Sequence, residues 1–328
     1  MNLDQLKNSI VYRATHIAAG EGYSFENFTF FQKGTQVGAA ITTGETLINI
    51  HNVRPGQSYL LEGDNNVPGI AGNCLTLTCD IQESDLTDEV RKEAFANMIL
   101  AFTKDENGSR AALIADPWAW AEKMIEMNGN STKKCRPYPY IAEVTLLNKL
   151  RAAGLLTDPE NEYLGPAAGT HDFELKTMSL ECKSHLHGDD ALNAGTLAIS
   201  SANQLSPTGN KPLYVVYFPM ENVGPESLEK CVADFGEPRA VIMSKLAENG
   251  FVEGDFAWQR PYRIQSTPLV YEINDAFPKI TPAQFPGGQF PSGITSLVYQ
   301  VSLQNLPSCP LDAFIAAKAA GVEPEFAV

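Results

Sequence analysis

Residues 169–186 have the sequence GTHDFELKTMSLECKSHL. Its charged side chains alternate with apolar ones, a pattern typical of strands that have one buried face. The charged residues are Asp172, Glu174, Lys176, Glu181 and Lys183. Two interpretations fit this pattern: a hairpin with one solvated face, or a metal site built on two adjacent strands.

The two halves of this stretch form an antiparallel hairpin if the turn is centred between residues 176 and 177. In that register Asp172 lies directly opposite Glu181, and both side chains point to the same face. At a separation of about 5 Å, two carboxylates repel by roughly 3 kcal/mol at an effective dielectric constant of about 20. A divalent cation held by oxygen ligands removes this cost. The backbone carbonyl of Cys182 is a candidate further ligand, and Lys183 shares the face of Glu181.

This combination of acids and a lysine suits the hydrolysis of a phosphodiester. A metal ion polarises the phosphoryl oxygens and lowers the pKa of a bound water. The lysine stabilises developing charge, or positions and deprotonates that water. A third acid, Glu143, lies in the apolar stripe of a predicted helix over residues 140–153. A carboxylate there needs a partner, although a glutamate at the edge of the stripe can also reach water.

Other sets of residues leave alternatives open. A second acid-x-Lys triplet, Glu174-x-Lys176, could be the active one with Asp158 as its partner. We prefer Glu181, because its run has apolar neighbours suited to a half-buried strand and an acid at the matching hairpin position. The three remaining candidates for transition-metal ligands or polar strand ends are His171, His185 and His187. The basic residues of a linker that could contact phosphates are Lys133, Lys134 and Arg136.

Composition limits the class of protein. The chain has 328 residues, of which 44% are hydrophobic and 19% are charged. No apolar run approaches the length of a membrane-spanning helix, and the first residues do not resemble a secretory signal. Six scattered cysteines without CxxC pairs favour a reduced cytoplasm. The net charge of −15 argues against broad, independent binding to nucleic acid, but it is compatible with a local basic groove or a partner that contacts DNA.

Periodicity predicts a β-rich start and a mixed remainder, divided at residues 1–128, 129–220 and 221–328. Strands are expected within residues 29–50, 74–81, 211–218, 268–273 and 296–303. Helices are expected over residues 88–102, from Pro117 to before Asn128, and over residues 140–153, 226–235 and 238–249. Residues 189–205 are expected to be partly helical.

Three segments together resemble the PD-(D/E)XK nuclease superfamily. They are Glu143 on a helix, the run Gly-Thr-His-Asp-Phe that contains Asp172, and Leu-Glu-Cys-Lys at residues 180–183. The sequence is most similar to a bacterial family of PD-(D/E)XK motif proteins that are often encoded near restriction and phage-defence genes. Asn203-Gln204-Leu205 and the segments at residues 275–280 and 296–303 also resemble that family, so the resemblance covers about residues 115–305. His171 stands where the motif has proline, which only shapes the start of the strand.

The resemblance implies an α/β fold with a restriction-endonuclease-like core, in which a mixed central sheet is flanked by helices, plus a β-rich N-terminal region and an α+β C-terminal extension. It implies that Asp172 and Glu181 bind Mg²⁺, or alternatively Mn²⁺, with Lys183 as the catalytic lysine and Glu143 as an accessory acid. Gln204 would contact the substrate or the lysine.

The implied function is that of a restriction-type endodeoxyribonuclease in phage defence. The expected partners are DNA and other restriction or defence proteins, with a homo-oligomer as a further option and no membrane. Two alternatives stay open: a catalytically silent subunit that binds DNA or proteins, and a nuclease that acts on RNA.

Overall fold

The computed structural model divides the chain into two compact units, Met1–Thr132 and Lys133–Val328. The described residues are 8, 12, 17, 20–24, 28–46, 50, 53–56, 59–80, 89–103, 109–127, 136–165, 170–187, 195–235, 239–251, 253–254, 256–292, 294 and 297–328. The boundary between the units falls near the predicted division at residue 128. The predicted division at residue 220 falls inside one strand, β10 (Leu213–Glu226), so the expected core and the C-terminal extension share a sheet.

The first unit contains a six-stranded antiparallel sheet in the order β1-β2-β3-β6-β5-β4. Its strands are β1 (Gly22–Ser24), β2 (Thr29–Lys33), β3 (Gln36–Gly44), β4 (Val53–Gly56), β5 (Tyr59–Asp64) and β6 (Asn73–Asp80). Three helices follow: α3 (Glu89–Thr103), α4 (Ser109–Ala115) and α5 (Pro117–Met127). Cys74 and Cys79 are buried on β6, as expected for core residues.

The second unit is built on a mixed sheet in the order β14-β12-β10-β8-β7, and β11 pairs with the far end of β10. Among the described strands of this sheet, β8 and β10 run parallel and the other pairs run antiparallel. The remaining strands are β7 (Phe173–Glu174), β8 (Ser179–Leu186), β11 (Tyr262–Ile264), β12 (Leu269–Glu272) and β14 (Cys309–Pro310). The apolar run predicted as a strand at residues 211–218 is therefore the centre of the sheet.

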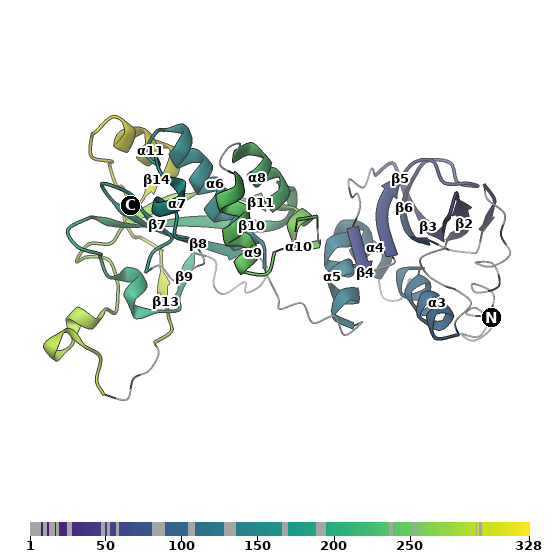
Figure 1. Cartoon of the computed structure of the whole chain (residues 1–328), viewed down its shortest axis with the longest axis horizontal. Coiled ribbons are helices and arrows are strands. Elements are labelled where there is room, and N and C mark those ends of the chain that lie inside the picture. The colour runs from purple at the N-terminus through teal and green to yellow at the C-terminus, as the bar shows by residue number, and fades with distance from the viewer. Residues whose placement is uncertain are drawn as a thin grey trace. The chain divides into compact units, whose positions relative to one another are not determined.

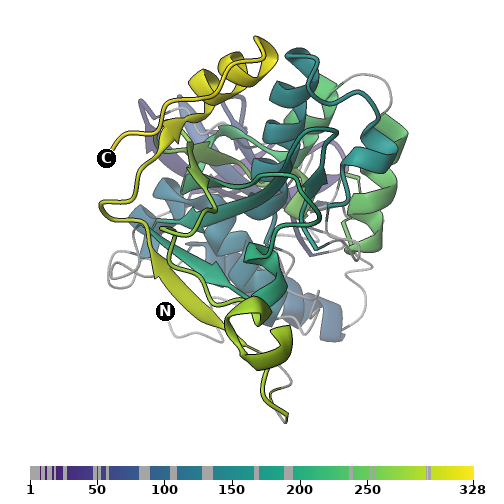
Figure 2. The ribbon, with the colours of Figure 1, turned by 90° about the vertical axis from the view of Figure 1, so that its left-hand side faces the viewer.

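Two different layers cover the faces of this sheet (Figures 1 and 2). Helices pack on one face around a large apolar core; they include α6 (Tyr138–Ala152), α8 (Leu228–Phe235), α9 (Arg239–Glu248), α10 (Phe256–Gln259) and α11 (Leu311–Ala319). The other face is covered by the two-stranded sheet of β9 (Thr196–Ile199) and β13 (Tyr299–Ser302), with a second apolar core. A mixed sheet flanked in this way is the predicted fold class.

Local signals account for most element boundaries. Helix α6 ends at Ala152, and Gly154 adopts a φ of +72° just beyond it, a conformation that suits glycine. Asp116 accepts a hydrogen bond from the backbone of Ala119 at the start of α5. In residues 189–205 the described part holds a strand, β9, and one 3-10 turn, η1 (Ala202–Leu205), so the helical expectation there is met only by the turn. No helix in the described part of the chain has the length and apolarity needed to cross a membrane.

Candidate active site

The predicted hairpin register is confirmed. Phe173 pairs with Leu180 and Glu174 pairs with Ser179. One step further along the same register, Asp172 lies opposite Glu181. The backbone N–H of Cys182 donates a 2.7 Å hydrogen bond to Oδ2 of Asp172, which holds this carboxylate against β8.

Glu181 and Lys183 form a direct ion pair on strand β8. Nζ of Lys183 lies 2.6 Å from Oε1 of Glu181, and the two side chains are 18% and 2% exposed. They share a face because they are two residues apart on a strand. The parallel strand β10 places Val215 beside Glu181 and Tyr217 beside Lys183. The Lys183 side chain is therefore partly exposed to solvent, whereas the Glu181 side chain is buried.

Glu143 joins this cluster from helix α6. Its side chain is buried, as its place in the apolar stripe indicated, and its partner is the hydroxyl of Tyr163, which donates to Oε2 at 2.9 Å. Tyr163 is itself buried between Glu143 and Phe173. Gly165 makes room for this arrangement, because a Cβ there would lie 2.7 Å from the Tyr163 ring.

The pKa values of all three acids are raised, mainly by burial. Burial, opposed by the Tyr163 hydrogen bond and reinforced by the charge of Glu181, raises the pKa of Glu143 to about 7. Burial and then the charges of Glu143 and Glu181 raise the pKa of Asp172 well above its usual range. Burial also raises the pKa of Glu181, although Lys183 opposes it.

The single positive charge of Lys183 does not neutralise the three acids of this cluster. Burial alone would lower the pKa of Lys183, but the carboxylates of Glu181 and Asp172 raise it above its ordinary value. The cluster thus holds three carboxyl groups against one ammonium group, and mutual repulsion disfavours the fully ionised form. A divalent cation between the carboxylates would reverse this effect.

The residues present fit a divalent cation bound by oxygen. Asp172 and Glu181 would supply carboxylates, and the main-chain carbonyl of Cys182 remains a predicted third ligand. Among the described residues, no group of three or more His, Cys, Asp and Glu side chains is arranged to hold a metal ion. A site with two carboxylates and one carbonyl needs only two such side chains, so this observation is compatible with it.

Gln204 has a local partner in the structure. It lies in the turn η1, where its carboxamide oxygen accepts hydrogen bonds from Ser200 and Ser201 and closes a capping box. The carboxamide oxygen of Gln204 is therefore already used within the turn. The contact of Gln204 with the substrate or the lysine stays a prediction, and the amide nitrogen is the atom that would make it.

The alternative triplet has a different environment. The Glu174 carboxylate is bonded to His171 Nδ1 at 2.8 Å and to the Ser179 hydroxyl at 2.7 Å, so it holds the hairpin together. Lys176 is exposed, and Asp158 caps the short helix α7 (Pro159–Glu162) through the backbone of Asn161. These three residues are not brought into a buried acidic cluster.

The remaining candidates are separated by the structure. His171 is buried next to Asp172, whereas His185 and His187 line a pocket at the end of β8. Arg136 is exposed at the start of the second unit, and Lys133 and Lys134 lie outside the described residues. The sequence did not indicate Tyr163, because a tyrosine after a short helix carries no spacing that connects it to Glu143.

The fold and this hairpin define a class of protein. A mixed sheet covered by helices on one face, with an acid just before one hairpin strand and Glu-x-Lys on the next, is consistent with the restriction-endonuclease-like fold of the PD-(D/E)XK superfamily. A family model described as "Putative PD-(D/E)XK family member, (DUF4420)" matches residues 141–304, and the chain belongs to this family. The match spans Glu143, the hairpin and β13. No match was found among curated proteins or among solved structures.

Proposed function

We propose that this chain is a Mg²⁺-dependent endodeoxyribonuclease of restriction type, which acts with partner proteins in phage defence. The observation that carries the proposal is the convergence of Asp172, Glu181 and Lys183 at one hairpin. Asp172 is fixed to the backbone of Cys182, next to the residue pair Glu181–Lys183. Family membership supports a nuclease-like activity, and the resemblance of the sequence motifs to proteins often encoded near restriction and phage-defence genes supports the biological role.

The proposed chemistry is hydrolysis of a phosphodiester by a water molecule. Asp172 and Glu181 would hold the cation, which would polarise the phosphoryl oxygens and lower the pKa of a bound water. The Lys183 ammonium group, released from Glu181, faces the scissile phosphate and stabilises the negative charge that develops on it. The hydrogen bond from Tyr163 holds Glu143 beside the two ligands, where its carboxyl group can orient water.

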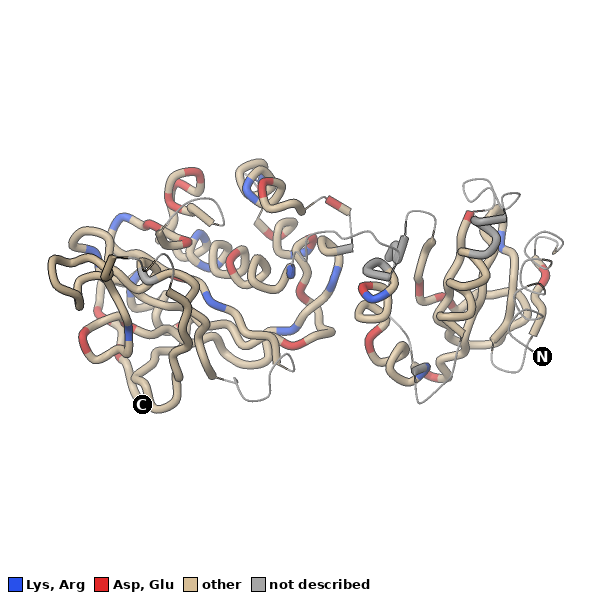
Figure 3. Tube along the Cα trace, turned by 90° about the horizontal axis from the view of Figure 1, so that it is seen from below, with Lys and Arg blue, Asp and Glu red and all other residues tan. Residues whose placement is uncertain are grey.

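Charge supports the involvement of partners. Lys and Arg are interspersed with Asp and Glu along the trace of the described residues (Figure 3), and the whole chain carries a net charge of −15. Because non-specific DNA affinity comes mainly from phosphate contacts with basic residues, partner proteins would supply much of it. The free, buried cysteines of the described chain (Cys74, Cys79, Cys182, Cys231 and Cys309) support a cytoplasmic setting.

A cleavage assay tests the function. Purified protein, alone and with the products of neighbouring genes, is incubated with double- and single-stranded DNA in Mg²⁺ or Mn²⁺. We expect the wild-type protein to cut DNA. The cutting rate should fall by at least about 10²-fold in each of three variants: Asp172→Ala, Glu181→Ala and Lys183→Ala. Lys176→Ala is the matched control, because it removes the lysine of the other acid-x-Lys triplet.

Two outcomes would contradict the proposal. Cutting that persists at the wild-type rate in the Asp172, Glu181 and Lys183 variants would place the active site elsewhere. DNA or partner binding without cutting in either metal would indicate a catalytically silent subunit, and cutting of RNA alone would change the substrate.

A further inference from the structure

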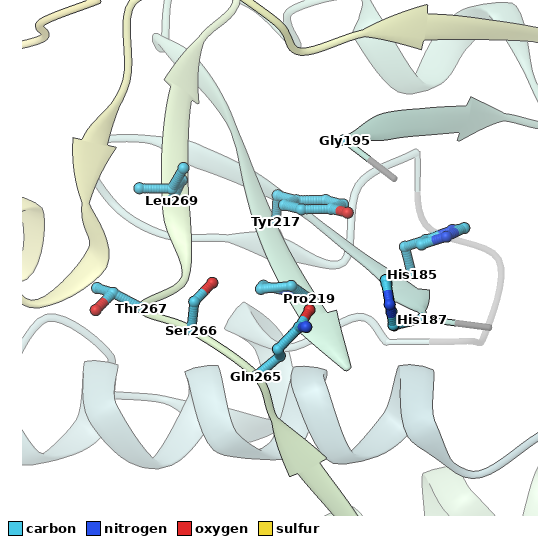
Figure 4. Close-up of a pocket in the computed structure, with 9 residues that line it drawn as sticks. All are labelled: His185, His187, Gly195, Tyr217, Pro219, Gln265, Ser266, Thr267 and Leu269. Carbon is cyan, nitrogen blue, oxygen red and sulfur yellow. The ribbon is translucent and has the colours of Figure 1, made fainter. Parts of the chain in front are cut away.

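A pocket of about 150 Å³ opens beside the candidate active site. It lies where β8 ends beside the middle of β10, next to the connection between β11 and β12 (Figure 4). Its floor includes Tyr217 and Pro219, and its rim includes His187, Gln265 and Ser266. Nothing in the proposed phosphodiester chemistry uses these side chains.

The pocket lies next to the site along strand β8. His185 follows Lys183 at a spacing of two residues within this strand, so the two side chains share a face, and His187 follows just beyond the end of the strand. The neighbouring strand gives the same result, because Tyr217 pairs with Lys183 and Pro219 pairs with His185. At about 3.3 Å per residue, the pocket begins roughly 7 Å from the lysine position. A base close in sequence to the scissile phosphate can span this distance.

The lining favours an uncharged, flat ligand group. Tyr217 is buried and supplies an aromatic wall, and Pro219 lies beside it. No Asp, Glu, Lys or Arg is among the described residues that line the pocket, which disfavours a phosphate or a metal ion as the occupant. The volume matches that of a cavity that holds a single six-membered ring.

Polar groups are placed to bind the edge of such a ring. Gln265 is exposed at the rim, and its carboxamide offers both a donor and an acceptor, the combination that pairs with base edges. Nε2 of His185 is buried and lacks a hydrogen-bond partner among the described residues. A buried polar atom of this kind is costly unless a ligand or water satisfies it.

We propose that this pocket binds one unstacked nucleobase of the DNA strand whose phosphate is cut beside Lys183. The proposal rests on the proposed function and adds to it a base-binding subsite, with Tyr217 as the stacking surface and Gln265 as the group that contacts the base edge. Enzymes that bind a base in a pocket act on single-stranded substrate or extrude the base from the duplex. The chain thus prefers DNA with an unpaired base next to the cut.

Photocross-linking tests the pocket without relying on catalysis. Wild-type protein in EDTA is irradiated with single-stranded DNA that carries 5-iodouracil, and the modified peptides are identified by mass spectrometry. We expect the main cross-link at Tyr217, His185 or His187. Cross-links that fall only on other parts of the chain, or no cross-link at all, would overturn the proposal.

An affinity comparison separates base binding from backbone binding. In EDTA, Gln265→Ala is expected to weaken binding of the single-stranded oligonucleotide by about tenfold. Binding of an abasic oligonucleotide of equal length should be unchanged. Gln289→Ala, which removes an exposed glutamine from a loop, is the matched control. Equal affinities of the Gln265→Ala and wild-type proteins for the base-containing strand would refute the role of Gln265 and of the pocket.

The two proposals fail in different ways. Cutting of DNA in Mg²⁺ without cross-links at the pocket would overturn the base-binding subsite and leave the nuclease intact. Cross-links at the pocket without cutting in Mg²⁺ or Mn²⁺ would support the subsite and count against the nuclease.

Discussion

Replacing Glu143 with glutamine is expected to stabilise the metal-free protein at pH 8. The substitution removes one of the three clustered acids and keeps a side-chain oxygen that can accept a hydrogen bond from the Tyr163 hydroxyl. A neutral side chain at this position no longer repels Asp172 and Glu181. Glu143→Gln would then be less active but more stable than the wild type, because the carboxylate that is proposed to assist the reaction is costly to bury.

The magnitude follows from the pKa of Glu143. Burial raises it from the ordinary 4.5 to about 7, and each pKa unit corresponds to about 1.4 kcal/mol, so ionised Glu143 costs about 3 kcal/mol of unfolding free energy. The folded pKa is above the unfolded one. The contribution of protonated Glu143 to the unfolding free energy is therefore fully present below pH 4.5, and it is lost as the pH rises through 7. Glu143→Gln should match the wild type near pH 4.5 and exceed it at pH 8.

Urea unfolding in EDTA at several pH values measures this effect. Trp258 lies in the second unit and is buried, whereas Trp118 and Trp120 lie in the first. Substituting the latter two with Phe makes fluorescence report on the unit that contains Glu143. Glu229→Gln, at an exposed position on α8, is the matched control and should change little.

The reasoning would be refuted if Glu143→Gln were no more stable than the wild type at pH 8. It would also be refuted if wild-type stability rose steadily between pH 5 and pH 8, since the raised pKa of the acids requires a fall. A gain of the same size at both ends of the pH range would mean that the variant acts through packing and not through charge.

Three further predictions concern the same cluster. At pH 8, Mg²⁺ at 100 times its dissociation constant should raise the unfolding free energy by about 2.7 kcal/mol, and calorimetry should show a smaller rise for Asp172→Asn. Tyr163→Phe removes a hydrogen bond that lowers the pKa of Glu143; the stability loss should therefore continue to higher pH than in the wild type, and urea titration at pH 5 should show a cost of about 1 kcal/mol. Lys183→Met should destabilise the metal-free protein more at pH 8 than at pH 5 in the same titration, because it removes the cation that faces Glu181; equal losses at both pH values would contradict this.

The hairpin could be predicted because its information is local. Alternation of apolar and charged side chains fixes which residues face the core, and a one-residue slip would reverse every side chain. The pairs Phe173–Leu180 and Glu174–Ser179 have the predicted register. The helix that carries Glu143 could also be predicted from local sequence, because its apolar stripe indicates the buried face and Gly154 indicates the end.

The partners of these residues depend on contacts that sequence spacing does not encode. Tyr163 reaches Glu143 from a segment 20 residues away, after a short helix with no apolar period of its own. Gln265 meets Pro219 and His185 only because β11 and β12 both pair with β10. The pocket is formed by pairing between strands that are distant in the sequence. Local periodicity predicts the individual strands and helices, but it does not predict this pairing.

The most direct measurement is anomalous X-ray diffraction from crystals of the protein soaked in Mn²⁺ at pH 8. We expect an anomalous peak within bonding distance of carboxylate oxygens of both Asp172 and Glu181, with Nζ of Lys183 displaced from Glu181. A saturating soak that leaves the 2.6 Å Lys183–Glu181 pair intact, with no peak between the two acids, would contradict it.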